Sequence, residues 1–97
     1  MLTGKQRRFL RAMGTAIDPI IHIGKAGLTE ALVRQLDEAM EARELVKVRV
    51  LANSASEPHN IGNELAKAAQ AELVQVIGRN MLFYRKSATK PFLELPE

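Results

Sequence analysis

The chain has 97 residues, 46% of them hydrophobic and 26% charged, so it can build one modest core and does not have the composition of a disordered polymer. It contains no cysteine, which excludes disulfides and thiolate metal sites. No apolar run approaches the roughly 20 residues of a membrane span. The basic N-terminus is not followed by the apolar stretch of a secretory signal. We therefore expect one domain without a membrane partner, in the reducing cytoplasm.

The net charge of +3 is unevenly distributed along the chain. Residues 1–27 sum to +4, residues 28–45 to −3 and residues 46–97 to +2. A basic surface at one end of the chain indicates an anionic partner. Charge alone fits a chance imbalance on a solvated surface equally well.

The first predicted element is a helix that Thr3 caps and that runs to about Ala16, before Asp18-Pro19 ends it. At 100° per residue, one face carries an apolar stripe of Leu2, Phe9, Met13 and Ala16. The opposite face carries Arg7, Arg8 and Arg11. We expect the stripe to pack on a core and the three guanidinium groups to face solvent.

A short strand over 20–23 follows, and Thr29 is expected to cap a second helix to about Arg43. The next strand, 45–51, alternates strictly between three valines on one face and Leu45, Lys47, Arg49 and Leu51 on the other. One face of this strand is therefore core, and the other is at least partly wet and basic.

Ser56 is expected to cap a third helix with Pro58 in its first turn. Two strands, 73–77 and 81–86, flank a hairpin signal at 78–80, where glycine and asparagine tolerate positive φ. The residues from Ser87 on contain two prolines and predict an extended or loose tail. We place the domain at 1–87 and the tail at 88–97.

This order, α-β-α-β-α-β-β, predicts an α/β fold. Strands separated by helices pair in parallel through right-handed crossovers, and a closing hairpin adds one antiparallel strand. The expected architecture is a single small two-layer domain with a four-stranded mixed sheet.

No catalytic site is indicated. His22 lies inside an apolar strand and His59 lies near a helix start, and neither has a nucleophile or metal-ligating neighbours at a diagnostic spacing. We expect no enzyme activity, no metal, no cofactor and no small-molecule substrate.

The stretch HIGKAGLTE (22–30) places Gly24-Lys25-Ala26-Gly27 between a strand and a helix. A Walker A loop would need glycine at Pro19 and Ser or Thr at Ala26, and the dinucleotide fingerprint would need a third glycine. The remaining Gly-x-x-Gly pattern suits a sugar-phosphate chain, with Lys25 and the helix N–H groups as partners. A tight strand-to-helix turn without a ligand is the alternative.

A second loop, VIGRNM (76–81), repeats the order of isoleucine, glycine and a cation, so Arg79 is expected at an exposed tip. Tyr84 and Arg85 could stack on a base. For Tyr84, a place at the edge of the core is the more frequent role.

Four segments in order, LTGKQRRFLRA, IIHIGKAGLTE, ELVKVRV and LVQVIGRNMLFYRK, closely resemble the CRM domain (chloroplast RNA splicing and ribosome maturation) in its bacterial stand-alone, YhbY-like form. The resemblance runs from about Leu2 to Lys86. It implies a fold like that of the C-terminal domain of translation initiation factor three, with sheet order 1-2-4-3 and the last strand antiparallel. It also implies an RNA-binding protein associated with precursors of the large ribosomal subunit, with the Gly-x-x-Gly loop and nearby basic side chains on RNA.

We therefore expect a monomeric cytoplasmic RNA-binding protein that assists assembly of the large ribosomal subunit through backbone contacts to structured rRNA. The expected surface joins the first helix to the Gly-x-x-Gly loop. The residues assigned to RNA are Lys5, Arg7, Arg8, Arg11, Gly24, Lys25, Ala26, Gly27, Arg79 and Arg85. The alternative is a protein-interaction module that joins a ribonucleoprotein through its acidic second helix.

Overall fold

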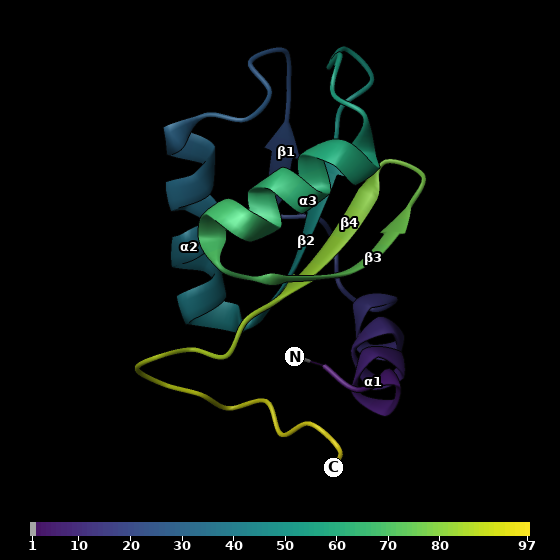
Figure 1. Cartoon of the computed structure of the whole chain (residues 1–97), viewed down its shortest axis with the longest axis vertical. Coiled ribbons are helices and arrows are strands. Elements are labelled where there is room, and N and C mark those ends of the chain that lie inside the picture. Colours follow the sequence, from purple (N-terminus) through teal and green to yellow (C-terminus); the bar gives the residue numbers. More distant parts are fainter. Residues whose placement is uncertain (1) are drawn as a thin grey trace.

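The computed structural model describes residues 2–97; Met1, the first residue of the expected domain, lies outside them. The order of three helices and four strands is the predicted one (Figure 1). The elements are α1 (Gly4–Gly14), β1 (Ile21–Ile23), α2 (Glu30–Arg43), β2 (Leu45–Val50), α3 (Pro58–Ala69), β3 (Glu72–Ile77) and β4 (Asn80–Tyr84). Within the described residues, no helix has the length and apolar character that a membrane crossing demands.

The strands form one sheet in the order β1-β2-β4-β3. β1 runs parallel to β2, and β4 runs antiparallel to both β2 and β3. The expected α/β fold, mixed sheet and strand order are confirmed. The ends of the strands differ slightly from those predicted, and β4 stops at Tyr84, so Arg85 and Lys86 follow the sheet.

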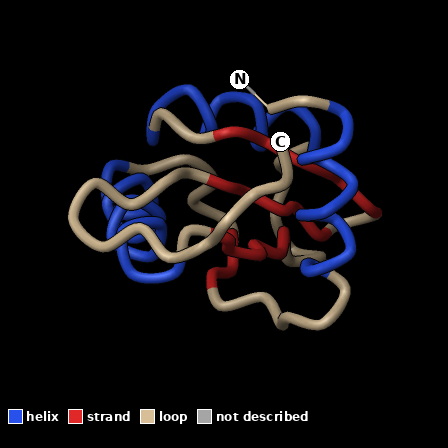
Figure 2. The backbone as a smooth tube through the Cα atoms, turned by 90° about the horizontal axis from the view of Figure 1, so that it is seen from below, coloured by secondary structure: helices blue, strands red, loops and turns tan. Residues whose placement is uncertain are grey.

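Both faces of the sheet are covered, to different extents. α2 and α3 pack on one face over a mainly aliphatic core that includes Ile21, Val48 and Phe83. The opposite face carries a smaller cluster that includes Leu10 of α1 and Leu82 of β4. The two-layer arrangement therefore describes α2, α3 and the sheet, and α1 lies on the other face toward one end (Figures 1 and 2). Apolar residues on both faces of β2 and β4 require this second cover.

Side chains cap the helix starts largely as predicted. The Thr3 hydroxyl accepts from the Gln6 N–H at 3.1 Å, and the Thr29 hydroxyl accepts from the Leu32 N–H at 3.1 Å. The expected cap of α3 is wrong, because the carboxylate of Glu57 accepts the first N–H groups of that helix in place of Ser56. Pro58 occupies the first helical position, which excludes the residue before it from the helix and makes that residue the cap.

The buried stripe of α1 is shifted from the predicted one. Leu10 is fully buried, whereas Phe9 is 37% exposed and Ala16 is exposed beyond the end of the helix. The other two members of the predicted stripe, Leu2 and Met13, do pack against the cluster around Leu10. Gly14 allows the close approach, since a Cβ there would lie 2.6 Å from Leu82 Cδ2.

The C-terminal tail was predicted to be extended or loose. It is extended, and it is fixed to the domain. Its anchor is Glu44, a fully buried carboxylate at the end of α2 with φ at +63°. The carboxylate accepts from the backbone N–H groups of Ser87 (2.7 Å), Phe92 (2.8 Å) and Leu93 (2.8 Å). Leu93 and Leu95 pack against the cluster around Leu10, and Gln6 Nε2 donates to the Pro96 carbonyl at 3.0 Å.

Candidate nucleic-acid interface

The part of the sheet that α1 leaves uncovered is a basic surface. His22 and Arg49 are exposed neighbours in the parallel register of β1 and β2, and Lys47 is half-buried two residues along β2. Alternation places all three side chains on the face opposite α2 and α3, because the residues between them are buried in the core on the other side. Gln75 and Ile77 of β3 share this face through their pairing with β4. We call these five residues the open face.

No carboxylate of the strands opposes the cations of the open face. Glu72 is the one acidic residue of the strands, and it pairs with Arg7 of α1 at 3.5 Å. Among the described residues, ion pairs involve Arg7, His59 and Arg85. No other lysine or arginine carries such a pair within the described part of the chain. Those on α1, the open face and the two loops at its end are Lys5, Arg8, Arg11, Lys25, Lys47, Arg49 and Arg79, and those elsewhere are Arg34, Arg43, Lys67, Lys86 and Lys90. Their charges are therefore available to an anionic partner.

The Gly-x-x-Gly loop lies at one end of the open face (Figure 1). The Gly27 N–H donates to the Gly24 carbonyl at 3.2 Å, which closes a tight turn with Lys25 and Ala26 exposed. The hairpin tip lies at the same end, because the Val50 N–H donates to the Arg79 carbonyl at 2.8 Å.

The two glycines of this loop differ in what the fold requires of them. Gly27 has φ at +65°, and a Cβ there would lie 3.3 Å from the Ser56 hydroxyl, so the turn itself calls for glycine. Gly24 has no positive φ, and a Cβ on it would meet no atom within 4 Å. The fold alone therefore gives no reason for a bare backbone at Gly24.

The basic residues of α1 do not reach the loop directly. α1 and the loop lie toward opposite ends of the 39 Å long axis, with the open face between them (Figure 1). Lys5 and Arg8 are exposed, and Arg11 is half-buried. The expectation that three guanidinium groups face solvent is wrong for Arg7, which donates to the Leu73 carbonyl at 3.3 Å and pairs with Glu72. This contact follows from the shifted stripe of α1, which turns Arg7 toward β3.

Tyr84 and Arg85 are engaged inside the fold. Tyr84 is 7% exposed, and its burial, with the nearby Glu44 carboxylate, raises the pKa of its phenol. The Arg85 side chain is 18% exposed and donates to Asp37 Oδ1 (2.7 Å), Glu41 Oε2 (3.2 Å) and the Ala69 carbonyl (2.7 Å). Tyr84 thus lies at the core edge, and we give Arg85 a structural role that joins α2 to the end of α3.

Replacing Arg85 by lysine tests this role. A lysine keeps the charge but not the planar fork that bonds Asp37, Glu41 and the Ala69 carbonyl together. We expect Arg85→Lys to lower the free energy of unfolding by about 1–2 kcal/mol and to leave RNA affinity within about twofold. Urea unfolding and RNA titration measure the two effects. A large loss of RNA affinity with unchanged stability would contradict the structural role and indicate that Arg85 contacts RNA.

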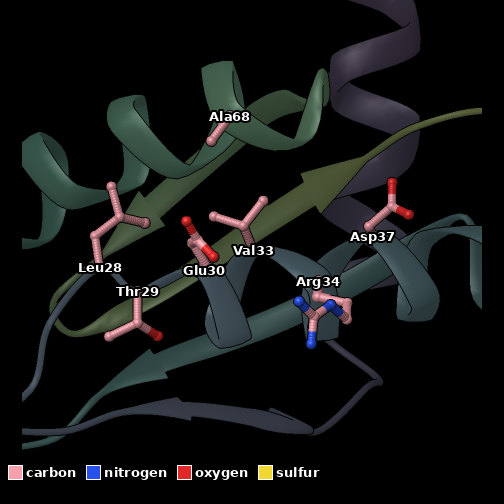
Figure 3. A pocket seen from close by; sticks show the side chains of 7 residues that line it. All are labelled: Leu28, Thr29, Glu30, Val33, Arg34, Asp37 and Ala68. Atoms are coloured by element: carbon pink, nitrogen blue, oxygen red, sulfur yellow. The ribbon is translucent and has the colours of Figure 1, made fainter.

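A groove between α2 and α3 lies on the face away from the basic surface (Figure 3). Its apolar part is formed by Leu28 and Val33, which point toward Ala68 of α3. Its titratable groups are Glu30, Arg34 and Asp37, and Asp37 is already bonded to Arg85. Residues 2–97 contain no cluster of His, Cys, Asp or Glu suited to a metal ion. The groove therefore offers a mixed-charge apolar surface without a constellation for catalysis.

The model of one protein family, the CRS1 / YhbY (CRM) domain, matches residues 2–85. The chain belongs to this family. The Bacillus subtilis member named "Probable RNA-binding protein YqeI" is 42% identical over 99% of this chain and 100% of its own length. A Methanocaldococcus jannaschii protein, "Probable RNA-binding protein MJ0652", is 36% identical over 87% of this chain and 63% of its own length. The solution structure of Staphylococcus aureus SAV1595 matches with a TM-score of 0.82 and 46% identity, covering 99% of this chain and 100% of that one.

Family membership fits the expectation of a protein that is not an enzyme, since these CRM relatives are named for RNA binding. Sequence reasoning left Lys47, Arg49 and His22 out of the expected site. The signal for two of them was present in the alternation of β2, which indicated a wet, basic face. What the alternation did not reveal is that β1 places His22 beside Arg49 and that both side chains stay exposed.

Proposed function

We propose that this protein binds RNA with the open face and the Gly-x-x-Gly loop, and that it works as a monomer in the cytoplasm on precursors of the large ribosomal subunit. The names of its relatives support RNA as the ligand. The ribosomal role rests on the family resemblance of the sequence. Contacts to phosphates along a basic face would bind structured rRNA through its backbone, with little sequence discrimination.

The observation that carries the proposal is that the open face and the elements at its two ends carry unpaired cations. Arg8 belongs to α1, Lys47 and Arg49 belong to the open face, and Lys25 and Arg79 belong to the two loops at its far end. Each phosphate neutralised by such a cation releases condensed counterions, so affinity falls steeply with salt. The test is titration of purified protein with naked structured RNA at several salt concentrations. Absence of binding at physiological salt would contradict the proposal.

Gly24 supplies a sharper test, because the fold does not require glycine there. We expect Gly24→Ala to leave the unfolding free energy within about 0.5 kcal/mol while lowering RNA affinity several-fold, since a methyl group would stand where the sugar-phosphate chain approaches Lys25. Gly27→Ala is the matched control, and it should cost about 1–2 kcal/mol of stability because φ is positive at that residue. Thermal unfolding and RNA titration of both variants measure these effects. Unchanged affinity in Gly24→Ala would remove the loop from the interface.

The alternative is a protein-interaction module that uses the acidic side of α2. It is weakened because several carboxylates of that helix are bonded within the protein. Asp37 and Glu41 bond Arg85, and Glu44 bonds the tail. The pKa of Glu41 is lowered, chiefly because its carboxylate accepts a hydrogen bond from the Ala88 N–H. Partial burial acts in the opposite direction and is outweighed. Glu30 and Glu38 remain for a partner. A protein that joins ribonucleoproteins only through another protein would not bind naked RNA at physiological salt.

The ribosomal role has its own experiment. RNA crosslinked to the protein in cells is recovered and sequenced. We expect enrichment of precursors of the large-subunit rRNA over other structured RNAs of similar abundance. Equal recovery of all structured RNAs would leave RNA binding standing and contradict the ribosomal role.

A further inference from the structure

The tail carries an exposed aromatic ring on a fixed backbone. Phe92 is 59% exposed, whereas Phe83 and Tyr84 are buried and Phe9 is 37% exposed. The Phe92 N–H is held by Glu44 Oε1 at 2.8 Å, so the anchor of the tail also sets the place of this ring. Phe92 lies beyond residue 85, where the match to the family model ends.

Phe92 forms one side of an apolar hollow that the tail makes with α1, the segment before β1, the end of α2 and β2. The other apolar residues that line the hollow are Met13, Ile17, Ile20, Ala42, Leu45, Val46 and Leu93. Ile20 is 41% exposed, so two large apolar side chains, Ile20 and Phe92, stand open to solvent beside one depression. Single exposed apolar residues are ordinary, but an apolar depression with such neighbours is typical of a binding site.

The charges around the hollow favour an anionic occupant. Arg43 and Lys47 line it together with one carboxylate, that of Asp18. Lys47 also lines a second depression, on the open face, with Gln75 and Ile77. The hollow is therefore continuous with the cations to which we assign RNA phosphates.

We propose that this hollow binds one unstacked nucleotide of an RNA strand, with its base against the Phe92 ring and its phosphate near Lys47 and Arg43. This inference rests on the proposed function and names the part of the RNA that is recognised, a single-stranded loop, bulge or end. Unpaired bases can be splayed out of an RNA and stacked on aromatic side chains, whereas bases in a duplex cannot. An apolar ring beside two cations matches the two chemistries of a nucleotide, and Asp18 can accept a hydrogen bond from a base amino group.

The test uses Phe92→Trp, because the chain contains no tryptophan and the new indole reports on its own surroundings. Titration with a hairpin RNA that carries an unpaired bulge should quench the indole fluorescence, and titration with a fully paired duplex should not. Gln35→Trp, at an exposed position of α2 on the opposite face of the sheet, is the matched control and should respond to neither RNA.

An affinity measurement complements the fluorescence. We expect Phe92→Ala to weaken binding of the bulged RNA by about 5-fold to 100-fold and to leave duplex binding unchanged. Phe92→Tyr should restore the affinity, whereas Phe92→Leu should not, because leucine keeps the apolar bulk and lacks the ring face. Each variant is checked by thermal unfolding.

The outcomes separate this inference from the proposed function. Binding of both RNAs by the wild-type protein, with no quenching in Phe92→Trp and no loss in Phe92→Ala, would overturn the nucleotide pocket and leave RNA binding intact. Equal losses for bulged and duplex RNA would also overturn it. Failure of the wild-type protein to bind either RNA would overturn both proposals.

Discussion

Reversing the two basic residues of β2, in the double variant Lys47→Glu with Arg49→Glu, is expected to lower the affinity for structured RNA by about 100-fold at low salt. Both side chains lie on the open face and carry no ion pair among the described residues, so they are free to neutralise phosphates. The slope of log affinity against log salt should fall by about 2, roughly one for each lost phosphate contact. Fluorescence anisotropy with a labelled RNA at four or more salt concentrations measures both quantities.

The control for this variant carries the same change of net charge on the other side of the molecule. Arg34→Glu with Lys67→Glu alters one exposed cation of α2 and one of α3. We expect a small loss of affinity from the changed net charge and no change of the salt slope. Similar losses in both double variants would mean that RNA is held by overall charge, with no defined interface on the open face.

The second large effect concerns the anchor of the tail. Burial of Glu44 alone would raise the pKa of its carboxyl, but the N–H groups of Leu93, Phe92 and Ser87 outweigh burial and lower it. A carboxyl whose pKa is lower in the folded state stabilises the fold above the pKa of the unfolded chain, and this stabilisation is lost as the pH falls through the folded value. We expect Glu44→Gln to lose about 1.5–3 kcal/mol of unfolding free energy at neutral pH, because one amide cannot accept from donors on both sides.

The pH dependence distinguishes a lost carboxylate from a general packing defect. The difference between the wild-type protein and Glu44→Gln should shrink as the pH falls below the ordinary glutamate pKa of about 4.3 and through the lower pKa of the folded carboxyl, where the wild-type group becomes protonated. Urea unfolding of both proteins at neutral and acidic pH measures this difference in unfolding free energy. Glu38→Gln, an exposed position on the same helix, is the control and should change little at either pH. A difference that is independent of pH would show that the Glu44 charge does not hold the tail.

Local signals predicted most of the fold. Thr3 and Thr29 cap their helices because a cap depends on residues only three positions away. The order of elements followed from periodicity, and the glycine of the hairpin, with φ at +57°, followed from turn chemistry. The same reasoning failed for Phe9 and Ala16 of the predicted stripe, which are exposed. It also failed at Ser56, where the effect of Pro58 on its neighbour was overlooked.

The rest depended on partners far apart in the sequence. Glu44 meets Ser87 and Phe92 across more than 40 residues, and Arg85 meets Asp37 across a similar separation. No local pattern predicts such contacts. From the sequence alone, the acidic residues of α2 were therefore interpreted as a solvated face or as a surface for a partner. For the same reason the loop residues of the candidate site were found from their motif, whereas the open face required the register of β1 on β2.

The most direct test of the account is a titration of isotope-labelled protein with structured RNA, followed by NMR through the backbone amide signals. We expect the largest shifts at the Gly24–Gly27 loop, at His22, Lys47 and Arg49, and at the Arg79 hairpin, with small shifts along the exposed sides of α2 and α3. Shifts concentrated around the α2–α3 groove, with an unaffected open face, would contradict the central claim that RNA binds on the opposite side of the sheet.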